Sequence, residues 1–165
     1  MGYTMKAEGL EDISKMLEQL GEAAPAAASM GLYEGAGEMA QAIKTEAQAI
    51  KADFFHYAVW ITRLPSLEEK AAVTAAAGSG IAKFDKNGTE VNTSVGFGKA
   101  GYVEINGKLK PIAQIANAIN SGTSFMNKQP FFRRAVNRGS RKAEDKIVKS
   151  IEATMDALIK QEGKA

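Results

Sequence analysis

The feature that most constrains this chain is a helix–break–helix pattern in residues 117–138. The first helix stops at Gly122, a residue that suits the left-handed conformation closing many helices. The second helix starts at Pro130, because a missing N–H costs nothing in the first turn of a helix. The pattern predicts two helices joined by a short surface break.

Apolar and cationic residues gather on this break and on the helix start that follows it. Phe125 and Met126 are apolar in a segment expected to be a surface loop, and aromatic residues then lie beside an arginine pair. This combination is more typical of a contact surface than of a catalytic pocket. The predicted subunit or partner interface is Ser121, Gly122, Thr123, Ser124, Phe125, Met126, Pro130, Phe131, Phe132, Arg133 and Arg134.

A basic cluster continues along the second helix. Arg138, Arg141 and Lys142 fall near the face that carries Arg134. This face could pair with acidic groups of a neighbouring subunit, contact DNA phosphates, or simply be solvated. Arginine favours bidentate contacts, while a pI of about 8.7 is low for a dedicated nucleic-acid domain.

The motif S-G-T-S followed by P-F-F-R-R-A-V resembles the signature of a tail-completion family of long-tailed bacteriophages. The similarity is strongest over residues 112–138, and it extends more weakly to residues 9–20, to the segment after Pro25 and to residues 95–97. The chain departs from the family at Thr62-Arg63-Leu64-Pro65, where many relatives carry a TG-x-L turn.

The resemblance implies a structural virion protein of the head–tail connector, or neck, that completes the tail by ring assembly. It implies a homo-oligomeric ring, expected to be a hexamer, that contacts other neck, connector and tail proteins. The basic cluster could also contact DNA in the channel without sequence specificity. The protein would reside in the virion and, during assembly, in the host cytoplasm. The alternatives are a minor capsid or tail protein at another position in the particle, or a DNA-binding module that uses the basic helix.

Composition predicts one soluble domain without catalytic chemistry. A chain of 165 residues with 45% hydrophobic residues can form one core, so residues 1–165 are expected to be a single domain. Cysteine is absent and His56 is the single histidine, so we expect no metal site, no cofactor and no enzyme activity. No signal peptide or membrane span is expected.

Charge is unevenly distributed along the chain. Residues 1–52 hold 4 Lys and 8 Asp or Glu, whereas residues 128–165 hold 10 Lys or Arg and 5 Asp or Glu. This asymmetry could favour head-to-tail packing of identical subunits, or it could belong to solvated helix faces.

Apolar spacing predicts the helices. A short helix from Gly9 to Leu20 should end at Gly21, and a long one should run from Pro25 to about Ala52 with small residues that admit a close neighbour. The aromatic segment from Phe54 to Leu64 could be helix or strand, and residues 53–80 could be a flexible or helical insertion. Ser66 and Glu69 predict a capping box.

Alternation and turn residues predict a small antiparallel sheet. Asn87-Gly88 and Asn106-Gly107 are hairpin signals between alternating segments. A helix with Ile112, Ile115, Ala116 and Ile119 on its apolar face should follow. The expected fold is α+β: a small antiparallel sheet packed against a long N-terminal helix and a C-terminal helix.

Overall fold

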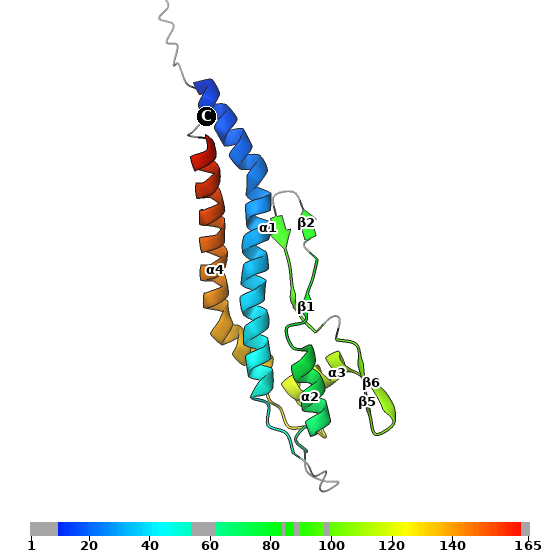
Figure 1. Ribbon diagram of the computed structural model, residues 1–165. Helices are drawn as coiled ribbons and strands as arrows, with labels where there is room; N and C mark the ends of the chain where they lie inside the picture. Colours follow the sequence, from blue (N-terminus) through cyan, green and yellow to red (C-terminus); the bar gives the residue numbers. More distant parts are fainter. Residues whose placement is uncertain (1–9, 54–61, 84, 88–89, 98–99, 163–165) are drawn as a thin grey trace, which may run out of the picture.

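Two long antiparallel helices form the axis of the molecule (Figure 1). The computed structural model describes residues 10–53, 62–83, 85–87, 90–97 and 100–162. Helix α1 (Leu10–Gln48) and helix α4 (Phe131–Glu162) lie side by side. In the view of Figure 1 the shorter helices and the strands lie on the other side of α1. The predicted α+β class, with a long N-terminal and a C-terminal helix, is confirmed.

Helix α1 is continuous where the sequence predicted a break. The prediction that Gly21 ends a first helix is wrong, because the chain stays helical through Gly21 and Pro25. A proline inside a helix removes one backbone hydrogen bond and crowds the carbonyl four residues earlier, which here belongs to Gly21. The alanine-rich sequence around Pro25 favours helix, and packing against α4 stabilises it further. The helix therefore accommodates its proline.

Small residues allow α1 and α4 to approach closely. A Cβ added at Gly35 would lie 2.4 Å from Cγ1 of Ile147, and one at Gly31 would lie 2.8 Å from Cγ1 of Ile151. On the other helix, a Cβ at Gly139 would lie 2.8 Å from Cβ of Ala42. The close neighbour expected for the first long helix is thus α4 of the same chain.

Helix α2 (Leu67–Ala76) begins with the predicted capping box. The Ser66 hydroxyl accepts the N–H of Glu69 (3.1 Å), and the Glu69 carboxylate accepts the N–H of Ser66 (2.9 Å). Val73 is fully buried, so α2 is part of the core of the domain. Of the undecided segment from Phe54 to Leu64, residues 54–61, which include His56, lie outside the described residues.

The strands form short antiparallel pairs at the two predicted turns. Asn87 pairs with Glu90 across the first turn. Asn106 and Gly107 both have positive φ (53° and 72°), as a two-residue type I′ turn requires. The pairs are β1 (Gly80–Ile81) with β4 (Val95–Gly96), β2 (Asp85–Asn87) with β3 (Glu90–Asn92), and β5 (Tyr102–Ile105) with β6 (Lys108–Pro111).

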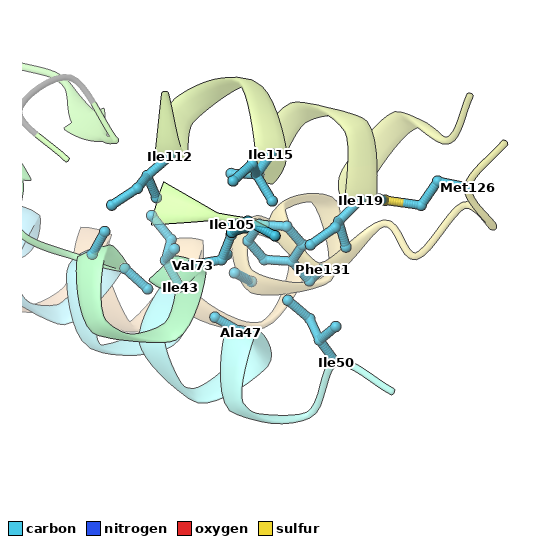
Figure 2. Packing of buried hydrophobic residues seen from close by; sticks show 14 residues of the cluster. Ile43, Ala47, Ile50, Val73, Ile105, Ile112, Ile115, Ile119, Met126 and Phe131 are labelled. Carbon is cyan, nitrogen blue, oxygen red and sulfur yellow. The ribbon is translucent and has the colours of Figure 1, made fainter. Parts of the chain in front are cut away.

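The core lies where the C-terminal half of α1 meets α2, β5, the start of α4 and helix α3 (Ile112–Ser121). All four apolar residues predicted for α3 are buried. Figure 2 shows the Phe131 ring among residues from these elements, with Ile105, Ile119 and Val73 nearby. The start of α4 is therefore anchored in the same core as the end of α1.

Candidate functional site

Helix α3 ends at Gly122, as predicted. Gly122 has φ +75°, and its N–H donates to the carbonyl of Ala118 (2.9 Å). A Cβ at this position would lie 2.9 Å from Cβ of Lys128, so a side chain would meet both strain and a steric clash. We call residues 121–134, which turn the chain from α3 into α4, the corner.

Hydrogen bonds within the corner fix its loop. The N–H of Thr123 donates to the carbonyl of Met126 (3.0 Å), and the N–H of Met126 donates to the Thr123 hydroxyl (3.0 Å). The N–H of Gln129 donates to the carbonyl of Ile119 (2.8 Å). The Gln129 side-chain amide also accepts from the N–H and donates to the carbonyl of Lys51, both at 2.8 Å. The loop is thus attached to the ends of both α3 and α1.

A segment distant in sequence pairs with this loop on its other side. The N–H of Arg63 donates to the carbonyl of Phe125 (2.8 Å), and the N–H of Asn127 donates to the carbonyl of Arg63 (2.9 Å). The Thr62 hydroxyl bonds the Asn127 side chain. Thr62 and Arg63, from the segment that departs from the tail-completion signature, therefore bond the corner directly.

The start of α4 is fixed by a side-chain cap from α3. The Asn120 side-chain oxygen accepts the N–H of Phe132 (3.1 Å). The Phe131 ring is 1% exposed and meets the Phe97 ring edge-on, with centroids 6.0 Å apart. A hollow of about 210 Å³ opens beside them, lined by Phe97, Ala113, Ala116, Asn117, Asn120, Phe131 and Phe132.

The structure divides the predicted interface residues between core and surface. Met126 and Phe131 are buried in the core, so their side chains are not at the surface of the chain, unlike the interface position predicted for them. Both lie at positions where the chain folds back onto α3, which directs them inward. Phe125 is 75% exposed. Of the remaining residues, Ser121, Thr123, Ser124 and Arg133 are exposed, and Gly122, Pro130, Phe132 and Arg134 are half-buried.

Two of the predicted basic residues are held by a carboxylate of the same chain. The Glu46 side chain, 5% exposed, accepts from Nε of Arg134 (2.8 Å) and from a terminal nitrogen of Arg138 (2.6 Å). Arg141 and Lys142 remain exposed. Sequence reasoning missed Glu46, although an acid between the buried positions Ile43 and Ala47 is a signal for a paired charge.

A second buried carboxylate ties the Arg63 segment to α2. Both oxygens of Glu69 accept from the Arg63 guanidinium (2.6 and 2.7 Å), and Nζ of Lys110 lies 3.9 Å away. Burial raises the pKa of Glu69, but the hydrogen bonds from Arg63 and from the N–H of Ser66, together with the two cations, outweigh it and lower the pKa overall. The carboxylate correspondingly raises the pKa of Arg63.

Among the described residues, no group of three His, Cys, Asp or Glu side chains is placed to hold a metal ion. In the same part of the chain, no helix has the length and apolar character needed to cross a membrane. The hydrogen bonds described above hold the corner loop, and the Phe125 side chain lies exposed on it.

Comparisons of this chain with protein-family models, with curated proteins and with solved structures found no match.

Proposed function

We propose that this protein is a structural component of the head–tail connector of a long-tailed bacteriophage, and that it completes the tail by assembling into a ring. The observation that carries the proposal is Phe125, an aromatic side chain held 75% exposed on a loop that is hydrogen-bonded on both sides. The resemblance of residues 112–138 to the tail-completion signature supplies the biological setting.

An exposed aromatic residue on a fixed loop has the properties of a binding anchor. Large aromatic side chains dominate the free energy of many protein interfaces, particularly when they enter a pocket on the partner. The carbonyl of Phe125 accepts the N–H of Arg63, and the N–H of Phe125 donates to the Thr123 hydroxyl (3.2 Å). Because the loop is already ordered in the free chain, binding would cost little further conformational entropy.

The experiment is replacement of Phe125 by alanine, with Leu109→Ala as the matched control. Leu109 is 72% exposed on the β5–β6 hairpin and lies outside the corner. Both variants should fold, since neither side chain belongs to the core. Phe125→Ala should reduce the joining of separately made heads and tails on the order of tenfold or more, and Leu109→Ala should leave it unchanged. Normal joining by a well-folded Phe125→Ala variant rejects the anchor.

A DNA-binding module is the alternative that one observation favours. Residues 131–142 hold 5 Lys or Arg and no acid. Against this, Arg134 and Arg138 are paired with Glu46, although the Arg138 side chain is still 75% exposed. Arg133, Arg141 and Lys142 are also exposed. Binding to random duplex DNA whose affinity falls steeply with salt would favour the alternative. Little affinity at low salt favours an assembly protein.

A further inference from the structure

The paired ends of α1 and α4 project from the molecule as a two-helix arm (Figure 1). We define the arm as residues 18–40 and 143–161, and the base as residues 41–53, 62–83 and 100–142. Each helix of the arm buries one stripe against the other, at positions such as Gly31 and Ile151. Large apolar side chains remain exposed on the arm: Met30, Tyr33, Val148 and Ile159. Met30 and Tyr33 lie one helical turn apart on α1 and line one hollow with Ser29 and Glu34, and grouped apolar side chains of this kind mark a surface that another protein can cover.

Charge indicates what covers it. The arm holds 8 Asp or Glu and 3 Lys, whereas the base holds 13 Lys or Arg and 5 Asp or Glu. The molecule is therefore acidic at one end and basic at the other. This division differs from the one along the sequence, because the second half of α4 joins the acidic end while its first turns belong to the basic end.

Ion pairs within the chain leave both ends charged. In the arm, Nζ of Lys146 lies 3.5 Å from the Glu34 carboxylate. The other acids of the arm are exposed: Glu18, Glu22, Glu38, Glu144, Asp145, Glu152 and Asp156. At the base, Glu46 holds Arg134 and Arg138, and Arg133, Arg141 and Lys142 stay exposed.

We propose that the acidic arm of one copy binds the basic start of α4 on a second copy. Copies packed in parallel would place arm beside arm and base beside base, which like-charge repulsion disfavours. A staggered or antiparallel arrangement instead brings opposite charges together and covers the apolar side chains of the arm. The inference rests on the proposed function, because it treats the chain as an assembly protein. It goes further by naming the two surfaces through which identical copies meet, the acidic arm and the basic start of α4.

A charge-swap experiment on the full chain tests this contact. The arm variant carries Glu22→Lys, Glu38→Lys and Glu152→Lys, and the base variant carries Arg133→Glu, Arg141→Glu and Lys142→Glu. All six side chains are exposed, so both variants should keep the fold, which circular dichroism verifies. Sedimentation velocity then measures self-association of each protein and of a mixture at about 50 mM and about 500 mM salt, since salt screens such attraction.

The wild-type chain should self-associate at low salt and weaken about tenfold or more at high salt, a change of roughly 1.4 kcal/mol. Each variant alone should be monomeric, and the equimolar mixture should recover association because each reversed surface then meets its complement. Monomeric wild type at about 100 µM and low salt overturns the inference, as does association that neither variant weakens. Binding of random duplex DNA by wild type, lost in the base variant, with no self-association, also overturns it.

The proposed function can fail or stand separately. If the arm–base contact fails while Phe125→Ala still prevents joining, the connector role stands without this self-contact. If the charge swap succeeds but Phe125→Ala joins heads and tails normally, self-association stands without the corner as anchor. A closed antiparallel dimer in the mixture would support the contact while contradicting a ring built from it.

Discussion

At the scale of single residues, the corner separates two phenylalanines that the sequence cannot distinguish. Phe125 and Phe131 both follow Gly122, the first in the loop and the second at the first residue of α4. Loop residues have no periodicity from which burial can be inferred. The structure buries Phe131 against Phe97 and exposes Phe125, because the loop hydrogen bonds to Arg63 direct the first ring outward. One ring therefore stabilises the fold, and the other is available for binding.

Replacing Phe131 with alanine should lower the free energy of unfolding by about 3–5 kcal/mol, the range for removing a buried aromatic ring. Urea unfolding followed by circular dichroism measures this change. Phe125→Ala is the control and should change stability by no more than about 0.5 kcal/mol, because the ring is exposed. Equal losses in the two variants would contradict the assignment of one ring to the core and the other to the surface.

Glu69→Gln should destabilise the chain at neutral pH, by on the order of 2–3 kcal/mol, because Arg63 loses its carboxylate partner. The folded state lowers the pKa of Glu69 below its ordinary value of 4.5. Its contribution is thus present above the unfolded pKa and is lost as pH falls through the folded value. The stability difference between wild type and variant should therefore shrink as pH falls from neutral into the acid range.

Chemical denaturation at a series of pH values measures this dependence, and Glu68→Gln provides the matched control. Glu68 is the exposed neighbour of Glu69 in the first turn of α2. Its replacement should have a small effect at every pH. A stability difference for Glu69→Gln that grew toward low pH would show that the carboxylate is not stabilised as an anion in the folded chain.

At the scale of helices and strands, the packing of α1 on α4 depends on particular glycines. Gly35→Ala should destabilise by about 1–3 kcal/mol, because its new methyl group would meet Ile147 and the carbonyl of Ala143. Gly37→Ala is the control, since nothing lies within 4 Å of its added Cβ. That variant should be stabilised by up to about 1 kcal/mol through helix propensity alone. Thermal unfolding separates the two, and equal stabilisation of both would contradict the close approach.

The sequence predicts the elements well where local chemistry decides them. The buried face of α3, the Ser66 capping box and the turn at Asn106 follow from spacing and side-chain type, and all three are confirmed. Local rules failed at Gly21, because α1 is stabilised by a helix more than 100 residues away in sequence. The position of Glu46 between buried residues signals a paired charge, but its two arginine partners are long-range, so no local pattern could identify them.

At the scale of the whole molecule, the antiparallel pairing of α1 and α4 rearranges the charge that the sequence displays. By sequence the basic segment is residues 128–165, yet in space its second half lies beside the acidic α1. The candidate site could be located from the sequence, at the Gly122 break. The sequence could not show which side chains of the site are exposed. Their exposure depends on Arg63 and Lys51, which bond the loop from distant parts of the chain.

The two-helix arm should also open more readily than the base. The helices of the arm pack mainly against each other, whereas the residues around Ile43 and Ala135 are surrounded by the core. Hydrogen exchange should therefore be faster for the amides of residues 18–30 and 152–161 than for those of residues 43–47, because local opening of the arm exposes less apolar surface than opening of the core. Mass spectrometry of peptides after timed exchange at high salt, where the arm–base contact is screened, measures this gradient.

Lowering the salt should then slow exchange in the arm, because the base of a second copy would cover it and opening would require dissociation. The variant with Arg133→Glu, Arg141→Glu and Lys142→Glu is the control. Its arm is unchanged in sequence but has no basic surface to bind, so its exchange should stay fast at both salt concentrations. If the arm of that variant were protected to the same degree as wild type, the protection would come from within one chain, and the arm would need no partner to be stable.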